Sequence, residues 1–233
     1  MKKRRIIKIS PSIIATDYVN EKNLDMALKE IEKAGANFVH LDVMDGKFVP
    51  STTFDFDFVE IVAQKTKLIL DVHLMVKNPE SVIDKYVAAG ADIITVHYEA
   101  CKDVAATLRK IKSKNVIAGV AINPDTSVLK IKDIIENRTA DLVNVMTVQP
   151  GASGQPFMPK CAEKIIEIRE YNRKVLIEVD GGVNTSNAAM LRNYGANILV
   201  SGSCVFKSKN MKSTIDKLKG KGFANRLKEM FSH

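Results

Sequence analysis

Four side chains that can bind a metal ion lie at the ends of three apolar segments of the chain. His40 and Asp42 lie in FVHLDVMDG, His73 lies in ILDVHLM, and Asp180 lies in LIEVDGG. Residues two apart in a β-strand point to the same face, so His40 and Asp42 project together. Two imidazoles and two carboxylates that converge on one point form a donor set for a divalent metal. We therefore expect a metal site if the fold brings these segment ends together.

The donor types restrict the metal without identifying it. A single histidine on a strand is more often a hydrogen-bonded core residue than a ligand, so the prediction depends on all four donors occurring together. This set suits Zn²⁺, Fe²⁺, Mn²⁺ and Co²⁺, and the order of affinities does not choose among them. No cysteine occurs at these segment ends, which argues against a structural zinc site. We expect one divalent ion, with Zn²⁺ placed before Fe²⁺, Mn²⁺ or Co²⁺.

Two more carboxylates and a third histidine accompany these donors. Asp71 precedes His73 by two residues and Glu178 precedes Asp180 by two, so each faces the same side at a deeper level. A buried carboxylate needs a partner, and orienting a metal-bound imidazole is one such role. The alternative is a pairing with a lysine or histidine of the interior. His97 also ends an apolar run, and we expect it to support the site or to be structural.

Short β-branched runs alternate along the chain with segments of helical periodicity. The runs span residues 6–10, 38–43, 68–74, 93–97, 116–122, 142–148, 175–179 and 198–201. Helical spacing is clear at 21–34 and again at 159–172, where Arg169 turns outward. The motifs KAGANF, AAGADI and NYGANI place Gly35, Gly90 and Gly195 where helices end in a left-handed residue.

Eight such repeats predict a (β/α)8 TIM barrel as a single domain over residues 1–233. The alternative is a doubly wound open sheet, which needs fewer strands and usually a G-x-G-x-x-G turn after the first strand. The segment ISPSII is no such turn. Catalytic residues of a TIM barrel lie at the C-terminal ends of its strands. The barrel therefore places all four predicted metal ligands at one mouth.

The composition fits a globular domain with a basic surface. The chain has 233 residues, of which 45% are hydrophobic and 27% charged, and its net charge is +8. This charge could attract nucleic acid or an anionic small molecule. The lysines are spread out apart from KKRR at 2–5, aromatic residues are 6%, and no nucleic-acid-binding motif is present. We therefore expect no nucleic acid partner.

The cysteines and the apolar runs indicate the cellular compartment. Cys101, Cys161 and Cys204 are odd in number and widely spaced, which fits a reducing compartment. The N-terminal apolar run is too short for a signal peptide, and no run approaches the ~20 apolar residues of a membrane span. We expect a cytoplasmic protein with no membrane partner.

Glycine-rich turns follow the last three runs. They span residues 149–155, 180–183 and 201–206. Backbone N–H groups of such turns bind anions, and barrels often bind phosphate after strands 7 and 8 with a short extra helix. Here that helix would begin near Ser203. Met44, Met75 and Met146 also face inward at run ends, where they would form an apolar lining that excludes water.

Six blocks of the chain carry a resemblance to one known family. They are ISPSI, HLDVMDGKFVP, DVHLMVKNPE, MTVQPG, IEVDGG and GSCVF, in this order. The chain resembles the ribulose-phosphate 3-epimerases over nearly its whole length. The resemblance implies metal-dependent epimerisation at C3 between D-ribulose 5-phosphate and D-xylulose 5-phosphate through an enediolate. It also implies a homo-oligomer and no redox cofactor.

The resemblance also implies roles for individual residues. His40, Asp42, His73 and Asp180 would hold the metal, and Asp42 and Asp180 would act as acid and base on opposite faces of the sugar. Ser12 and His73 would contact the substrate near the metal. The methionines would cap the intermediate. The phosphate would lie against backbone groups of Gly151, Gly154, Gly181, Gly182, Gly202 and Ser203.

Three positions depart from the family's usual pattern. Ala152 and Ser153 replace a bulky aromatic residue and a Gly or Ala in a candidate lid, and Ser51 replaces the Asn usual after FVP. A six-carbon substrate such as D-allulose 6-phosphate is therefore an alternative. Lyase or synthase chemistry would favour a lysine at a strand end, and Lys8 is the only lysine within the runs. A non-catalytic sugar-phosphate-binding barrel is the remaining alternative.

Overall fold

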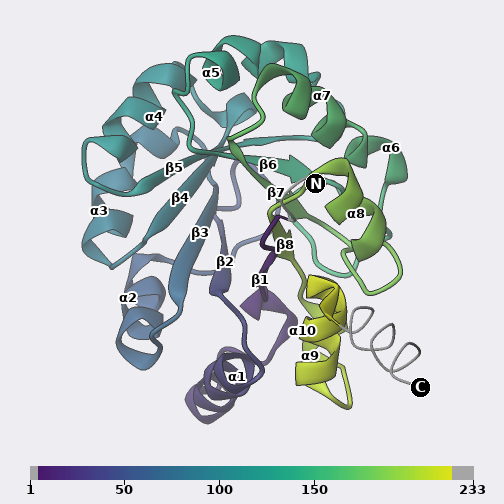
Figure 1. The fold of residues 1–233 in the computed structure, drawn as a ribbon. Helices are drawn as coiled ribbons and strands as arrows, with labels where there is room; N and C mark the ends of the chain where they lie inside the picture. Colours follow the sequence, from purple (N-terminus) through teal and green to yellow (C-terminus); the bar gives the residue numbers. More distant parts are fainter. Residues whose placement is uncertain (1–4, 222–233) are drawn as a thin grey trace, which may run out of the picture.

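The computed structural model describes residues 5–221, so most of the basic cluster at 2–5 lies outside the described residues. Its strands form one parallel sheet in the order β1-β8-β7-β6-β5-β4-β3-β2. Their bounds are β1 Lys8–Ser10, β2 Phe38–Met44, β3 Ile69–Met75, β4 Ile93–His97, β5 Ile117–Ile122, β6 Leu142–Met146, β7 Leu176–Asp180 and β8 Ile198–Val200. Figure 1 shows the helices as an outer ring around these strands. The (β/α)8 barrel and its eight predicted strands are confirmed.

The barrel closes between β1 and β2 through a few backbone contacts. The His40 N–H donates to the carbonyl of Pro11 and the Asn37 N–H to the carbonyl of Ile9, both at 3.0 Å. Ser12 and His40 form an isolated parallel bridge just beyond the end of β1. The closure therefore brings the chain after β1 directly against the proposed ligand His40.

The helices cover the outside of the barrel with one apolar face each. The α-helices are α1 Glu21–Lys33, α2 Phe56–Lys65, α3 Ile83–Ala88, α4 Val104–Lys112, α5 Lys132–Glu136, α6 Pro159–Ala162, α7 Lys164–Tyr171, α8 Ala188–Tyr194, α9 Ser203–Phe206 and α10 Met211–Lys219. Short 3₁₀ helices are η1 Ile13–Ala15, η2 Pro79–Ser81, η3 Tyr98–Ala100 and η4 Val128–Ile131. In α1, the Asn20 side chain caps the N-terminus by accepting from the Asn23 N–H. The buried face of α1 consists of Leu24, Ala27, Leu28 and Ile31. Among the described helices, none is long and apolar enough to cross a membrane.

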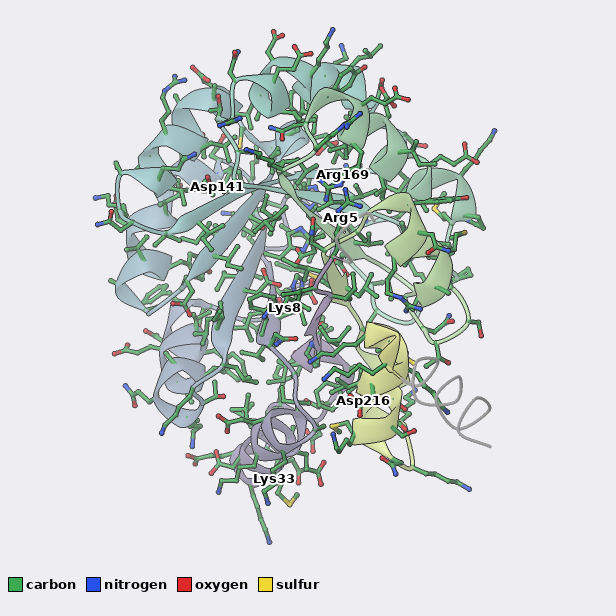
Figure 2. The ribbon with its side chains drawn as sticks, viewed as in Figure 1. Arg5, Lys8, Lys33, Asp141, Arg169 and Asp216 are labelled. Carbon is green, nitrogen blue, oxygen red and sulfur yellow. The ribbon has the colours of Figure 1, made fainter. Side chains whose placement is uncertain are left out.

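The segment 159–172 differs from the predicted single helix. It divides into α6 and α7 at Glu163. Arg169 does not turn outward, because its guanidinium donates to the carbonyls of Val175 at 2.6 Å and Gly195 at 2.8 Å. A guanidinium has five N–H donors, which suits it to unpaired carbonyls at the ends of neighbouring elements. Figure 2 shows Arg169 toward the middle of the view, whereas side chains that end in nitrogen or in oxygen point outward around the rim.

The barrel interior changes from apolar to polar toward the C-terminal ends of the strands. The layer nearer the N-terminal ends of the strands takes one residue from each even-numbered strand. It consists of Phe38, Ile93, Leu142 and Ile198. Above it lie fully buried polar side chains: Ser10, His40, Asp71, Thr95, Asn144 and Glu178. Interiors of such barrels are usually filled by branched apolar residues. A polar interior at this level indicates that the upper half of the barrel serves a chemical site.

Candidate active site

The four predicted metal ligands converge at the C-terminal mouth of the barrel. The Nε2 atom of His40 lies 3.3 Å from Asp42 Oδ1 and 3.6 Å from Asp180 Oδ2. The Nδ1 atom of His73 lies 3.4 Å from each of the same two oxygens. One donor atom from each residue falls within 4.8 Å of all the others. The strand alternation and the barrel together therefore place the four donors as predicted.

The donor atoms facing the centre of this cluster have the chemistry of metal ligands. His40 Nε2 and His73 Nδ1 are buried, and neither forms a hydrogen bond within residues 5–221. Buried polar atoms are normally paired, so two such nitrogens facing two carboxylates call for a common partner. A divalent cation satisfies all four donors at once. The His40, Asp42, His73 and Asp180 set therefore fits the metal that the resemblance implies.

The electrostatics of the cluster favour a cation. Burial alone would raise the pKa of Asp42, but the charge of the adjacent His40 imidazole holds this pKa well below its usual range. Burial opposes a charge on His40, yet the carboxylates of Asp71 and Asp42 raise its pKa well above the ordinary value. The pKa of Asp180 is also lowered, against burial, by the adjacent imidazoles of His40 and His73. Carboxylates held ionised in a buried site attract positive charge, whether protons or a metal ion.

The second ring nitrogen of His40 is already occupied. Its Nδ1 lies 2.8 Å from Asp71 Oδ2, which also accepts from Ser10 Oγ at 2.7 Å. Asp71 therefore orients an imidazole, as one of the two sequence interpretations held, but the ring belongs to β2 rather than to its own strand. His40, Asp71 and Glu178 also lie close enough to hold an ion, but this Nδ1 already has its carboxylate partner. The four-residue cluster is therefore the better candidate site for an ion.

Glu178 lies beside Asp71 in the polar interior. Its side chain is fully buried, and neither carboxyl oxygen has a hydrogen-bond donor within the described chain. Burial and the charge of Asp71 raise the pKa of Glu178 well above its ordinary value. Both influences favour the neutral acid, whose O–H could donate to Asp71.

A cavity of about 580 Å³ opens above the cluster. The predicted site residues that line it are Ser12, Asp42, Met44, Met75, Met146, Gly151, Gly154, Asp180, Gly181, Gly182, Gly202 and Ser203. His40 and His73 are fully buried beneath it. The cavity has the volume of a small-molecule site, and it joins the cluster to all three glycine-rich turns.

Both cavity aspartates are held by neighbouring hydroxyl groups. Ser12 Oγ donates to Asp42 Oδ2 at 2.6 Å, which fixes the carboxylate from the β1 side. Thr147 Oγ1 donates to the carbonyls of Asp180 at 3.0 Å and Gly181 at 2.6 Å. Ser12 therefore fixes the carboxylate of Asp42, and Thr147 fixes the backbone of Asp180. The side chains of Asp42 and Asp180 are only 10% and 14% exposed.

The turn after β7 requires glycine for two reasons. Gly181 has a φ of 120°, which side chains rarely adopt, and a Cβ there would lie 2.7 Å from the backbone N of Val148. A Cβ on Gly182 would lie 2.8 Å from the backbone of Phe157. The turn therefore packs directly against the chain that follows β6, and the two turns form one wall of the cavity.

Several residues of the site were not predicted from the sequence. Lys207 follows α9 and lines the cavity beside the turn after β8, so the cavity contains a cation although no lysine ends a strand. Thr147 and the buried interior residue Asn144 also went unrecognised. Their spacing carries no motif. The one sequence signal for Lys207 was its position, four residues beyond Ser203, where the predicted phosphate-binding helix begins.

Fold and site together define the class, a (β/α)8 barrel with a buried two-histidine, two-aspartate cluster at its mouth. Solved structures of similar shape include KGPDC from Streptococcus mutans, with a TM-score of 0.69 and 14% identity over 93% of this chain and 97% of that one. Another is 3-hexulose-6-phosphate synthase from Salmonella typhimurium, with a TM-score of 0.68 and 14% identity over 94% of this chain and all of that one. At such identity the likeness concerns the fold alone.

The sequence comparisons are more specific. The profile of the Ribulose-phosphate 3 epimerase family matches residues 8–206. A ribulose-phosphate 3-epimerase of Bacillus subtilis is 42% identical over 220 residues, which cover 92% of this chain and 99% of that protein. A chloroplastic ribulose-5-phosphate-3-epimerase of Arabidopsis thaliana is 39% identical over 91% of this chain and 76% of its own length. The chain belongs to the ribulose-phosphate 3-epimerase family, which confirms the resemblance carried by the six sequence blocks.

Proposed function

We propose that this protein epimerises C3 of a ketose phosphate and interconverts D-ribulose 5-phosphate and D-xylulose 5-phosphate. One observation carries the proposal. Asp42 and Asp180 belong to a cluster that fits a divalent metal, and both line a cavity that also reaches the glycine-rich turns. The names of the relatives supply the substrate class, and the site supplies groups suited to the chemistry.

Epimerisation requires two groups that exchange protons with opposite faces of C3. One aspartate accepts the C3 proton as the enediolate forms, and the other returns a proton to the opposite face. Because the reaction runs in both directions, Asp42 and Asp180 exchange the roles of acid and base with the direction. Hydrogen bonds from Ser12 and Thr147 hold their carboxylate and backbone groups in place.

His40, Asp42, His73 and Asp180 would hold the divalent ion, for which Zn²⁺ remains our first choice. When bound, such an ion supplies a Lewis acid for the carbonyl next to C3. Met44, Met75 and Met146 line the cavity beside the aspartates and are at most 5% exposed. An apolar lining of this kind keeps water from the reacting carbon.

The phosphate group would lie at the glycine-rich end of the cavity. Gly181, Gly182 and Gly202 present backbone without side chains there, and the remaining predicted contacts are Gly151, Gly154 and Ser203. Lys207 adds a positive charge to the same lining. The net charge of +8 is consistent with an anionic substrate.

The proposal is tested with purified protein, metal analysis and solvent deuterium. We expect one divalent ion per chain, loss of epimerase activity on chelation, and recovery on re-addition. During turnover in D₂O, deuterium should enter C3. Asp42→Asn and Asp180→Asn each keep an oxygen ligand but lose the proton-transfer group, so kcat should fall on the order of 10²–10⁴-fold. Full activity in either variant with metal still bound would contradict the acid–base assignment.

A six-carbon ketose phosphate is the second candidate substrate. Ala152 and Ser153, which depart from the family's usual pattern, both line the cavity and leave small side chains there. We expect the pentulose phosphate to be preferred, and the ratio of kcat/KM for D-ribulose 5-phosphate and D-allulose 6-phosphate measures this directly. Bound metal with no turnover of either sugar would instead favour a non-catalytic binding protein. We further propose a homo-oligomer, which light scattering would measure.

A further inference from the structure

The ring nitrogen of His73 that points away from the metal cluster contacts a second imidazole. His73 Nε2 lies 2.8 Å from Nε2 of His97, the last residue of β4. The two rings are nearly parallel, at 17°, with centroids 4.9 Å apart, and both side chains are fully buried. The ring of Phe48 packs against His97, with ring centroids 4.8 Å apart. The contact between the histidines is therefore dry, and one nitrogen must donate while the other accepts.

The position of the metal ligand decides the direction of this hydrogen bond. If His73 Nδ1 is to bind a cation, it must carry no proton. The ring then carries its proton on Nε2 and donates it to His97 Nε2. His97 can accept only if its own proton is on Nδ1. The ligand role of one ring therefore dictates the tautomer of the other.

The groups that face His97 Nδ1 favour that tautomer. Glu99 Oε2 lies 3.4 Å from this nitrogen, and the Asn123 side chain also interacts with the ring. Burial would raise the pKa of Glu99, but its contact with His97 and its hydrogen bonds with Thr126 and Asn123 lower it, so Glu99 is an ionised acceptor. A neutral imidazole has a single ring proton to place. A carboxylate acceptor draws that proton to Nδ1.

Glu99 is itself held from the neighbouring loop. Its Oε1 accepts from the backbone N–H of Asn123 at 2.9 Å and from the hydroxyl of Thr126. The carbonyls of Asn123, Pro124 and Thr126 in turn accept hydrogen bonds from Nζ of Lys164, at 2.7 to 2.8 Å. Helix α7 therefore fastens the loop after β5, and this loop fixes the carboxylate that faces His97.

We propose that Glu99 and His97 are positioning residues, which fix the tautomer and orientation of His73 so that its Nδ1 points unprotonated into the metal cluster. His40 obtains the same support directly, because its Nδ1 faces the carboxylate of Asp71 at 2.8 Å. His73 obtains it through one intervening ring. This inference rests on the metal centre proposed above and adds the two residues that orient its ligand His73.

Metal affinity is the first test, measured by competition with a chelator on the full chain. Glu99→Gln keeps the size of the side chain, but an amide that still accepts from Asn123 and Thr126 presents its NH₂ to His97. The His97 proton then loses its acceptor. Loss of such support typically weakens metal binding 10–100-fold, and we expect a Kd increase in this range. Glu60→Gln, on the exposed side of α2, is the matched control and should leave the Kd unchanged.

Two substitutions of His97 separate hydrogen bonding from packing. His97→Phe fills the space beside Phe48 and removes the acceptor for His73 Nε2–H. His97→Gln keeps an acceptor oxygen on a shorter, flexible side chain. We expect the Kd for metal to rise at least tenfold in His97→Phe and to be partly restored in His97→Gln. Equal affinities of both variants and the unaltered protein would overturn the proposal.

A measurement on the unaltered protein does not depend on how the variants fold. In the zinc-loaded protein, ¹⁵N spectra of the imidazoles identify which ring nitrogen carries the proton. We expect Nε2–H on His73 and Nδ1–H on His97, and a proton on Nε2 of His97 would overturn the proposal. The two proposals fail separately. An unaltered protein that binds no metal contradicts the metal centre, whereas equal metal binding by Glu99→Gln contradicts only the positioning role.

Discussion

Ser51 Oγ donates a hydrogen bond of 2.6 Å to the carbonyl oxygen of Gly151. This contact joins the loop after β2 to the glycine-rich loop after β6, across 100 residues of sequence. Gly151 also packs on Val49, so that a Cβ there would lie 3.0 Å from the Val49 side chain. Ser51, where the resemblance leads us to expect an Asn, thus holds the loop that contains Ala152 and Ser153. These departures belong to one structural unit, the candidate lid.

We predict that Ser51→Ala loosens this loop and weakens substrate binding. A hydrogen bond of this kind contributes about 1 kcal/mol net, which corresponds to a roughly fivefold higher KM with little change in kcat. Steady-state kinetics with D-ribulose 5-phosphate measure the effect. Ser113→Ala is the control, since Ser113 Oγ donates to the carbonyl of Lys110 at 2.7 Å at the exposed end of α4. Equal KM values for both variants would show that the lid does not depend on Ser51.

Gly181→Ala should damage the site more than the strain of its backbone alone explains. Its Cβ would lie 2.6 Å from the Val148 side chain and 2.7 Å from the Val148 backbone N, so the turn must move. Displacement of this kind lowers kcat/KM on the order of a hundredfold. Gly35→Ala, with a φ of 85° and no atom within 4 Å of the new Cβ, controls for strain alone. We expect the control to lose about 1–2 kcal/mol of stability and to retain its kcat/KM.

The alkaline stability of the protein should depend on Tyr86. Burial raises the pKa of Tyr86 from 10.0 to about 12, with smaller contributions from Asp55 and Asp45. A raised pKa in the folded state means that the phenol stabilises the fold fully below pH 10. This contribution is lost as the pH rises from 10 toward 12, because the unfolded chain ionises first. One pKa unit corresponds to about 1.4 kcal/mol, so the loss amounts to roughly 2 kcal/mol near pH 11.5.

Tyr86→Phe removes this ionisation, and denaturant unfolding between pH 8 and 11.5 measures it. The stability difference between the two proteins at pH 8 sets the baseline for the substitution itself. Above pH 10 we expect the unaltered protein to lose stability faster than Tyr86→Phe. Curves that remain parallel through this range would contradict the raised pKa.

The fold was predictable because its signals are local. Each strand is a β-branched run, and each of the helices before Gly35, Gly90 and Gly195 ends at a glycine with positive φ. The convergence of His40 and Asp42 was predictable for the same reason, since strand alternation and the barrel rule apply without knowledge of partners. Local patterns therefore determine which side chains face inward, and at which level.

The partners of those side chains were not predictable, because they depend on register between strands. Alternation placed Asp71 below His73, but its hydrogen bond goes to His40, its register partner on β2. Glu99 lies in η3, outside every strand, and its hydrogen-bond donors are residues 123 and 126 of another loop. No spacing along the chain encodes such contacts. The four proposed metal ligands were therefore predictable, whereas the residues that form hydrogen bonds with them were not.

Substitutions of Glu178 test whether the polar interior contains a neutral acid. If Glu178 is protonated and donates to Asp71, Glu178→Gln keeps a donor of the same shape, and we expect its stability to change by less than about 1 kcal/mol. Glu178→Leu removes the donor and leaves Asp71 Oδ1 buried without a hydrogen-bond partner in the described chain, which should destabilise the fold by about 1–3 kcal/mol. Denaturant unfolding at pH 7 compares the two variants. If Glu178 were instead ionised, Glu178→Gln would remove a buried repulsion with Asp71 and raise the stability clearly. The stability change in Glu178→Gln therefore shows whether Glu178 is a neutral acid or a second charge beside Asp71 beneath the metal cluster.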